Sequence, residues 1–393
     1  MSPVSSPHAP DDRKSAHLAA QRVTVQPNAR LVGDYLVARE ILRSGKMHQA
    51  GVDADGVNTD NPEQSPVFYL DGEAHRKKRS SIARFFTSNA VATRHRPVML
   101  RTCESIMRQF RAVGEESLDD MAHRLTVTVA AEIVGLTDSN PRAMAKRIAA
   151  TLSSPAGWKW LARLLAPLQM RYRATNFYLR DVRPSIRERR RAPKDDIISR
   201  LIDEGYSERA IMIECMTYAA AGMVTTREFI VMAAWHLFER DTLRARFLAG
   251  DEADQTAILE EILRLEPVAS MLFRRAAEEI PDFAGGPIAV GTVFNIDLRS
   301  ANSDESVMGA CPHALDPDRS RAAKAGAGSL SFGHGSHRCP GSQVALHETR
   351  LFLDQLLRLP GIQLRRAPTM GWHEMLMSYE LRNAVVVCDK SDA

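Results

Sequence analysis

Cysteine is scarce in this chain of 393 residues, and the placement of the few cysteines excludes two kinds of structural site. There are 5 of them, an odd number for a disulfide framework, and no two form a CxxC pair of the kind that binds zinc. Unpaired thiols are typical of a reducing compartment, so we expect a cytoplasmic protein. The five are Cys103, Cys215, Cys311, Cys339 and Cys388.

Long apolar runs and a strong charge of one sign are missing as well. No stretch approaches the length of a membrane span, and residues 1–17 lack the apolar core of a signal peptide. We therefore expect a soluble protein with no membrane partner. The formal net charge of +4 at pH 7 is too small to indicate nucleic-acid binding. Because the basic patch of the chain has no aromatic interleaving and the chain has no recognised nucleic-acid-binding module, we expect no nucleic-acid partner.

Internal repeats and domain linkers are also absent. The hydrophobic content of 44% is enough to bury one large core or two ordinary ones, and we favour one large helical domain. We expect a single domain over residues 21–393, preceded by residues 1–20, a polar and proline-rich segment that we expect to be disordered.

Apolar residues recur at helical spacing through most of the first half of the chain. The predicted helices cover residues 31–44, 74–86, 95–113, 118–134 and, with Ser207 as N-cap, a long helix ending at Glu239. Strand signals come later, at residues 288–298 and 375–387. Helices followed by a small sheet predict a mainly α fold with a small β region.

The segment 155–191 mixes tryptophan and leucine with basic residues. Its periodicity favours a pair of amphipathic surface helices, and a mobile lid over a pocket is the alternative interpretation. The run RERRR at residues 187–191 is typical of a solvated helix end.

The most informative stretch is the decapeptide FGHGSHRCPG, residues 332–341. Gly333 and Gly335 let the backbone turn tightly and approach a flat ligand closely. Pro340 suits the first position of a helix, so Cys339 would stand at a helix N-terminus, where backbone N–H groups favour thiolate over thiol. Thiolate is the form that ligates iron. Taken alone, a loop cysteine is more often a small buried hydrophobic residue.

A second stretch, AAAGMVTT at residues 219–226, places small residues and two threonines in the middle of the long helix. Glycine and hydroxyl groups that bond back to the helix can locally open its hydrogen-bond ladder. A flat cofactor and dioxygen fit against such a thin segment, whereas the alternative is close packing of this helix against a neighbour.

FGHGSHRCPG matches the haem-binding loop of the cytochrome P450s, whose pattern is FxxGxHxCxG. This resemblance implies the helix-rich P450 fold and a haem b cofactor. It implies that Cys339 is the proximal iron ligand and that His337 donates to a haem propionate, with Phe332 and Gly333 contacting the haem.

AGMVTT resembles the oxygen-binding motif (A/G)Gx(D/E)T of the same family. The resemblance implies that Gly222 lies against the haem and that Thr225 is the catalytic threonine that orients dioxygen. Val224 departs from the pattern because it occupies the position of the acid that relays protons. We therefore expect slower or less tightly coupled oxygen activation, with Glu228 or solvent as a substitute proton source.

Three further elements resemble P450 motifs in the expected order. Glu261 and Arg264 match ExxR, and Arg319 matches the arginine that closes a buried triad, which we interpret as structural.

His75 and Arg79, on one face of a helix, match HxxxR, and Arg274 matches a third propionate partner, although Arg275 leaves its register open by one residue. The alternative for each of these cations is a solvated basic residue.

The resemblance implies a monomeric monooxygenase that takes electrons from a ferredoxin or flavodoxin and its reductase. A basic patch suits docking of such an acidic carrier; it comprises Arg76, Lys77, Lys78, Arg84 and Arg338. The residues expected near a substrate are uncharged, which predicts a small apolar organic substrate alongside dioxygen; they are Val268, Ala269, Ser270, Met271, Leu272, Ala219, Met223, Val224 and residues 375–377.

Two alternatives remain open on the same scaffold. The first is a peroxide-driven or oxidative-coupling enzyme, which Val224 favours. The second is a haem-thiolate sensor or binding protein that does not turn over.

Overall fold

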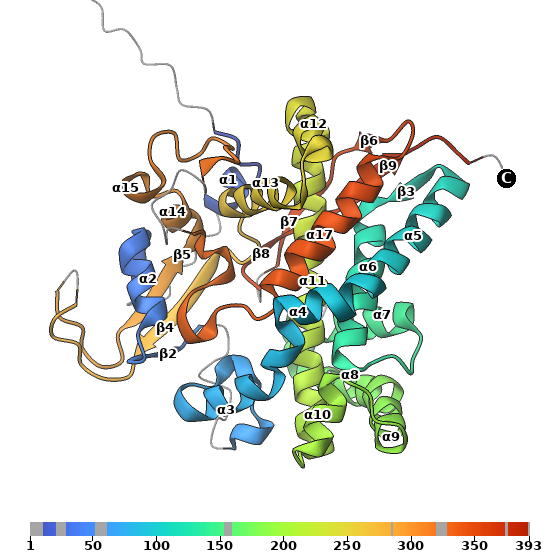
Figure 1. The fold of residues 1–393 in the computed structure, drawn as a ribbon. Helices are drawn as coiled ribbons and strands as arrows, with labels where there is room; N and C mark the ends of the chain where they lie inside the picture. Colours follow the sequence, from blue (N-terminus) through green and yellow to red (C-terminus); the bar gives the residue numbers. More distant parts are fainter. Residues whose placement is uncertain are drawn as a thin grey trace, which may run out of the picture. The chain divides into compact units, whose positions relative to one another are not determined.

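The computed structural model describes residues 11–20, 29–51, 61–152, 159–283, 286–319, 328–373 and 376–391, and its course is drawn in Figure 1. The chain packs into two compact units, each assembled from segments that are distant in sequence. Unit 1 comprises Met1–Val52, Met232–Cys339 and Pro368–Arg382. Unit 2 comprises Asp53–Val231, Pro340–Ala367 and Asn383–Ala393.

Unit 2 is mainly helical, and α17 and α6 both pack against α5 (Figure 1). Its small sheet has the strand order β3-β9-β6, in which both neighbours of β9 are antiparallel to it. Its helices are α3 (Gly72–Ala83), α4 (Ser88–Ala90), α5 (Arg96–Val113), α6 (Leu118–Val134), α7 (Pro141–Leu152), α8 (Lys159–Phe177), α9 (Arg183–Arg191), α10 (Ile197–Asp203) and α17 (Ser342–Leu357), and its strands are β3 (Glu115–Ser117), β6 (Gln363–Arg366) and β9 (Val385–Val387).

Unit 1 is built on a sheet of order β1-β5-β4-β2, in which β1 runs parallel to β5 and the other pairs are antiparallel. The buried face of α2 packs on this sheet in one hydrophobic cluster, and β7 and β8 form a separate antiparallel pair. Its strands are β1 (Arg30–Val32), β2 (Met47–Gln49), β4 (Met271–Ala276), β5 (Val293–Asp297), β7 (Thr369–His373) and β8 (Ser378–Arg382), and its helices are α1 (Ala16–Ala20), α2 (Tyr35–Arg43), α12 (Asp241–Ala249), α13 (Glu252–Leu265), α14 (Leu298–Asn302) and α15 (Glu305–Met308).

The long helix α11 (Glu208–Glu239) belongs to unit 2 up to Val231 and to unit 1 beyond it. Ser207 was predicted to cap this helix, and the helix begins directly after it. The Ser207 hydroxyl accepts a hydrogen bond from the Ala210 amide at 3.3 Å. Both ends of α6 also agree with the prediction. The Ser117 hydroxyl caps its first turn, and Gly135, with a φ of 98°, ends it.

The predicted helix over residues 31–44 is wrong at its start. Residues 30–32 form the strand β1, and the helix begins only at Tyr35 because the Asp34 carboxylate caps it by accepting from the Val37 amide at 2.8 Å. The predicted strands at 288–298 and 375–387 correspond to β5 and to β8 with β9. The sequence analysis missed the remaining strands.

The expectation of disorder through residue 20 is wrong for residues 11–20. Ser15 is buried, and its hydroxyl and amide donate to the carboxylate of Glu266, which is also buried. The Asp12 amide donates to the His313 carbonyl at 3.0 Å, and its carboxylate accepts from Arg240 at 2.8 Å. This segment is therefore anchored within unit 1, while the first ten residues lie outside the described part of the chain.

The segment 155–191 forms two helices, α8 and α9, joined by a π-helical turn over Tyr178–Val182. Residues 155–158 of that segment lie outside the described residues. The interpretation of RERRR as fully solvated is wrong for Arg189, which is 1% exposed. Its guanidinium donates to Asp196, to Asp138 at 2.8 Å and to Thr137 at 2.8 Å, and these partners compensate its burial.

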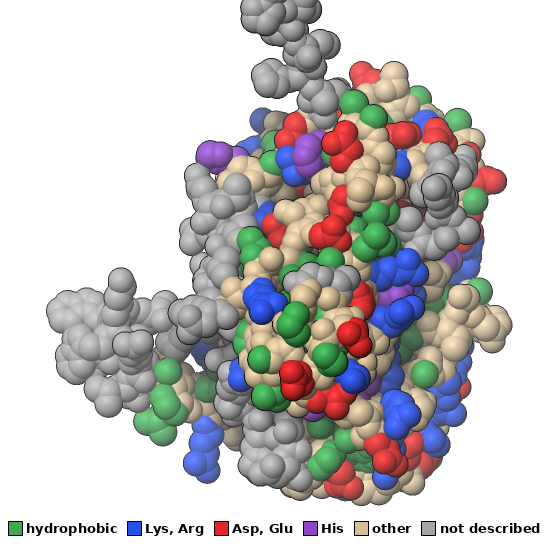
Figure 2. Space-filling model, turned by 90° about the vertical axis from the view of Figure 1, so that its left-hand side faces the viewer, with side chains coloured by type: hydrophobic (Ala, Val, Ile, Leu, Met, Phe, Trp, Pro, Cys, Tyr) green, Lys and Arg blue, Asp and Glu red, His purple; other side chains and the backbone are tan. Residues whose placement is uncertain are grey.

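Among the described residues, no helix is both long and apolar enough to cross a bilayer. Figure 2 shows one face of the molecule, on which basic, acidic and hydrophobic side chains are interspersed.

Candidate functional site

The decapeptide around Cys339 forms a tight loop in unit 1. Two single 3-10 turns, Leu330–Phe332 and Gly335–His337, flank Gly333, and the Cys339 amide donates to the Phe332 carbonyl at 2.8 Å. This bond brings the two ends of the motif together. Cys339 is partly exposed. The helix that was expected to begin at Pro340 begins at Ser342, so Cys339 stands three positions before the first residue of α17.

Glycine is required at position 335 by both conformation and space. Gly335 has a φ of 71°, and a Cβ on it would lie 2.3 Å from the Leu42 carbonyl oxygen. The loop therefore rests on the C-terminal end of α2, and any side chain at 335 would push it away. Gly333 also has a positive φ, of 68°, but a Cβ there would meet only ordinary contacts, the nearest being Leu272 at 3.7 Å.

Two other cations predicted for this site also belong to unit 1. Arg274 lies on β4 with 4% of its surface exposed, and its Nη1 donates to the Phe273 carbonyl at 2.7 Å. Arg275 is less buried, because successive side chains of a strand point to opposite faces. His337 lies in the second 3-10 turn and is partly exposed.

The Cys339 loop is held by a polar network that begins at Glu261. Arg264 binds the Glu261 carboxylate at 2.7 Å and 2.8 Å, and Arg319 binds it at 3.2 Å, so the predicted triad is present in unit 1. Arg264 also donates to the Asn302 carbonyl at 2.7 Å. The Asn302 side chain accepts from the Leu330 amide at 2.8 Å, directly before the loop.

Asn302 is a positioning residue that the sequence analysis missed. It is fully buried, and its side-chain amide donates to Ser331 Oγ at 2.9 Å and to the Arg264 carbonyl at 3.2 Å. No motif marks it, because a single asparagine at the end of a short helix carries no pattern of its own.

The remaining predicted site residues belong to unit 2. His75 and Arg79 lie on α3, one turn apart on the same face, with His75 buried and Arg79 partly exposed. The charge of Arg79 acts on the hydroxyl of Tyr218, where it opposes the effect of burial on the tyrosine pKa.

Within α11, the Thr225 hydroxyl donates to the Ala221 carbonyl at 2.5 Å, as expected for a threonine that bonds back to its own helix. The helix nevertheless continues without interruption from residue 208 to 239. The Thr126 hydroxyl on α6 donates to the Met223 carbonyl at 3.0 Å, adding a second polar contact to this part of α11. Val224 is buried, with 7% of its surface exposed.

Gly222 faces α6, where a Cβ added to it would meet the Ala130 Cβ at an ordinary contact distance of 3.6 Å. It also lines a cavity of about 60 Å³, which we call the interior pocket. Its walls come from α6, α11, α17 and Phe86. The residues lining it are Phe86, Thr126, Val129, Ala130, Ile133, Val134, Tyr218, Gly222, Thr226, Gly341, Val344, Ala345 and Glu348.

Glu348 is the only carboxylate among the residues that line the interior pocket. Burial raises its pKa to about 8, and its Oε1 has no hydrogen-bond partner among the described residues. At neutral pH the side chain therefore carries a proton.

Glu228, the expected substitute for the missing acid, is fully buried and ion-paired with its neighbour. Arg227 donates to one Glu228 oxygen through Nε at 2.9 Å and Nη2 at 2.6 Å. Glu228 is therefore already engaged by a neighbouring guanidinium.

The expected basic patch is smaller than predicted. Lys78 is 3% exposed and forms an ion pair with Glu214 at 2.6 Å, so it presents no charge at the surface. Arg84 lies 3.1 Å from Asp195. Arg76, Lys77 and Arg338 are exposed.

Comparisons with known proteins agree with these motifs. A family model described as Cytochrome P450 matches residues 255–360. The chain is 27% identical over 312 residues to the biotin biosynthesis cytochrome P450 of Bacillus subtilis (strain 168), covering 77% of this chain and 76% of that protein. It is 27% identical over 374 residues to the mycinamicin IV hydroxylase/epoxidase of Micromonospora griseorubida, covering 91% of this chain and 89% of that protein.

The fold agrees with solved structures. The cytochrome P450 PksS of the Bacillus subtilis 168 bacillaene polyketide synthase superposes with a TM-score of 0.75 at 21% sequence identity, covering 92% of this chain and 91% of that one. The predicted fold class is therefore confirmed.

Proposed function

The chain belongs to the cytochrome P450 family, and we propose that Cys339 carries its activity as the thiolate ligand of a haem b group. The chain is accordingly an oxidoreductase of the monooxygenase class. The observation that carries the assignment of Cys339 is the closed loop in which this sulfur precedes α17. Helix N-termini stabilise a thiolate, and Cys339 forms no disulfide.

The surroundings of Cys339 fit a haem group. Gly333 and Gly335 let the backbone of the loop approach a flat group closely, while Asn302 fixes the amide of Leu330 at its start. When bound, the haem iron supplies reductive activation of dioxygen, which thiolate ligation promotes.

Carboxylates of the bound group need cationic or donor partners. In unit 1 we assign these roles to Arg274 and His337, and in unit 2 to His75 and Arg79. Phe332, Gly333 and Gly222 supply the close contacts to its flat surface.

Thr225 is proposed as the residue that orients dioxygen. Its hydroxyl proton is directed to the Ala221 carbonyl, which leaves the lone pairs of Oγ1 to accept a hydrogen bond. Because neighbouring Val224 has no acidic group, Thr225 positions a proton donor but does not itself supply protons.

We propose an apolar organic substrate that receives one atom of dioxygen. Val268, Met223 and Val224 are buried and uncharged, as is Met271 on β4, and such side chains favour apolar ligands. Met375, expected near them, lies outside the described residues.

A ferredoxin or flavodoxin is proposed as the electron donor. The exposed basic side chains of Arg76 and Lys77 on α3 suit an acidic carrier. The cytoplasm is proposed as the compartment, since the five cysteines are all unlinked.

Spectroscopy of the reduced carbon monoxide complex tests the assignment of Cys339. We expect the red-shifted Soret band of thiolate ligation in the wild type and in Cys311→Ser, which changes an exposed cysteine of the same unit. Cys339→Ser should lose that band. A thiolate spectrum in Cys339→Ser, or a wild-type protein that binds no haem, would refute the assignment.

A peroxide-driven or oxidative-coupling reaction is the second candidate, and the buried Val224 favours it because such chemistry needs less proton delivery. The rate of product formation with hydrogen peroxide alone distinguishes this candidate from the monooxygenase reaction. Peroxide rates equal to those with reductase and dioxygen would select the second candidate.

A further inference from the structure

A buried ion pair joins α3 to α11 in unit 2. Lys78 is 3% exposed and Glu214 is fully buried, with Lys78 Nζ 2.6 Å from Glu214 Oε1. The same ammonium donates to the carbonyl oxygens of Pro62, Glu63 and Ser65 at 3.2, 3.0 and 2.6 Å. Removing two charges from water is costly, and apolar replacements of such pairs are often neutral or stabilising. A gain in stability therefore does not by itself explain why this ion pair is present.

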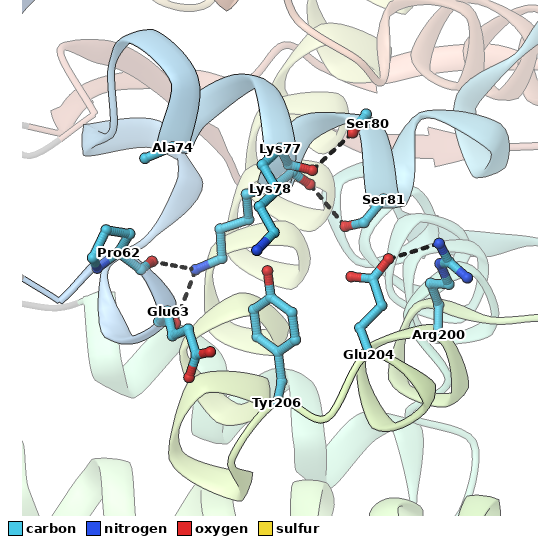
Figure 3. A pocket seen from close by; sticks show the side chains of 10 residues that line it. All are labelled: Pro62, Glu63, Ala74, Lys77, Lys78, Ser80, Ser81, Arg200, Glu204 and Tyr206. Atoms are coloured by element: carbon cyan, nitrogen blue, oxygen red, sulfur yellow. Dashed lines mark hydrogen bonds and ion pairs between the residues drawn. The ribbon is translucent and has the colours of Figure 1, made fainter.

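The Lys78 end of the ion pair borders a pocket that opens to solvent. Lys78 lines a pocket of about 400 Å³ that is open on one side, which we call the open pocket. Figure 3 shows Lys78 extended toward Pro62 and Glu63, with the Tyr206 hydroxyl pointing into the same pocket from the opposite wall. Water in this pocket can reach the ammonium group.

The inner end of the pair leads to the interior pocket. Glu214 and Tyr218 are one turn apart on α11, and the negative charge of Glu214 adds to the larger effect of burial in raising the pKa of Tyr218 well above its usual value. The buried Tyr218 hydroxyl has no hydrogen-bond partner among the described residues, so it can bind water. Tyr218 lines the interior pocket together with Gly222, Thr226 and Glu348. Its ring packs against Phe86 with centroids 6.1 Å apart, so the hydroxyl is held in place. A cavity of about 60 Å³ has room for water.

We propose that Lys78, Glu214 and Tyr218 form a path that carries protons from the open pocket to the interior pocket, beside the 222–226 segment of α11. The proposal rests on the proposed function. Reduction of dioxygen to water consumes protons, and this chain has Val224 in place of an acid and a Glu228 already bound by Arg227.

Each transfer along this path conserves protons. Lys78 passes a proton to Glu214 and regains one from water in the open pocket. Glu214 passes a proton through a bridging water to the Tyr218 oxygen, while Tyr218 releases its own hydroxyl proton to water in the interior pocket, which leaves the tyrosine neutral. The charges that face these groups are those of Arg79, which acts on Tyr218, and of Glu63 and Glu204, which act on Tyr206.

The first transfer, from Lys78 to Glu214, is energetically unfavourable but still fast enough for enzymatic turnover. An ordinary lysine and an ordinary carboxyl group differ by about 6 pKa units, which slows a transfer by about 10⁶ from the limit of about 6 × 10¹² s⁻¹. Burial raises the pKa of Glu214 and narrows this gap. Turnover at typical enzyme rates of about 10 s⁻¹ is far slower than the resulting step.

Glu348 provides a readout that needs neither substrate nor electron donor. Its carboxyl proton faces the interior pocket, and its pKa of about 8 lets a rapid jump from pH 6 to pH 10 remove it. The decay of its infrared carboxyl band, identified by its absence in Glu348→Gln, reports how fast protons leave the pocket.

Tyr218→Phe and Glu214→Gln should each slow this decay at least tenfold, because both keep the shape of the side chain and remove the transferable proton. Ser80→Ala, at the wall of the open pocket, is the matched control and should leave the decay unchanged. A decay in Tyr218→Phe within twofold of the wild type would overturn the path.

A second measurement links the path to the reaction. In the reductase-supported reaction, Glu214→Gln should release several times more hydrogen peroxide per product than the wild type. A slowed infrared decay with unchanged peroxide release would overturn the link to oxygen activation. Failure of the proposed function is distinguishable, because the infrared measurement requires no turnover.

Discussion

Arg264 donates two hydrogen bonds to the Glu261 carboxylate, from Nε to Oε2 at 2.7 Å and from Nη2 to Oε1 at 2.8 Å. Both side chains are about 95% buried, with 4% and 5% of their surfaces exposed. Through its third nitrogen, Arg264 reaches the Asn302 carbonyl, and Asn302 in turn fixes the amide of Leu330 at the start of the Cys339 loop. The pair therefore joins α13 to the loop that carries the expected iron ligand.

Arg264→Lys should destabilise the protein strongly, because a lysine cannot satisfy Glu261 and Asn302 together. Breaking a buried ion pair costs about 3–5 kcal/mol. Urea unfolding with haem bound measures this loss. Arg358→Lys is the control, since Arg358 forms an exposed pair with Asp354 and should change stability by less than about 0.5 kcal/mol. Equal midpoints for the two variants would contradict the structural role of Arg264.

Gly335→Ala should displace the Cys339 loop. The new Cβ would meet the Leu42 carbonyl oxygen at 2.3 Å, and the φ of 71° is unfavourable for alanine. We expect haem retention after gel filtration to fall several-fold.

Gly72→Ala serves as the control for backbone strain. Gly72 has a similar φ of 61°, but a Cβ there would meet nothing within 4 Å. Haem retention should stay at the wild-type level in this variant. If both variants lost haem equally, the close approach to α2 would not be the cause.

Local signals in the sequence were sufficient to predict those elements whose ends are set by residues close to them in the chain. Both ends of α6 follow from Ser117 and Gly135, which act within one turn of the helix. The Cys339 loop was predictable for the same reason, since its glycines, cysteine and proline are contiguous.

Features that depend on distant partners were not predictable. Lys78 was expected at the surface because its partner Glu214 lies far along the chain, on another helix. The anchoring of residues 11–20 depends on Glu266, which is 251 positions from Ser15. Arg189 was misjudged similarly, since a run of arginines does not reveal which of them finds carboxylates.

Glu348 should make stability fall as the pH rises. Its carboxyl group ionises near 4.5 in the unfolded chain and near 8 in the folded one, so between these values the folded chain holds the extra proton. Stability from this group is greatest below pH 4.5 and declines toward pH 8, by up to roughly 5 kcal/mol at about 1.4 kcal/mol per pH unit.

Glu348→Gln removes this dependence and keeps the side-chain shape. Urea unfolding at pH 5 and pH 8.5 should show a stability difference between variant and wild type that grows in favour of the variant at the higher pH. All other titrating groups cancel in that comparison. A constant difference at the two pH values would show that Glu348 ionises normally in the folded chain.

Val224→Glu should improve the coupling of electron consumption to product formation. The change places an acid next to Thr225, at a position that is 7% exposed, and a carboxyl group there supplies the proton that valine cannot. We expect hydrogen peroxide release per product to fall several-fold in the reductase-supported reaction.

Val224→Gln is the matched control, because glutamine has the size of glutamate but no transferable acid proton. Introducing Val224→Glu into the Glu214→Gln variant adds a second test. If the buried path through Glu214 supplies protons in the wild type, Val224→Glu should restore the coupling that Glu214→Gln loses, since the new acid bypasses the broken step. Equal peroxide release from Val224→Glu and Val224→Gln would mean that proton supply near Thr225 does not limit this enzyme.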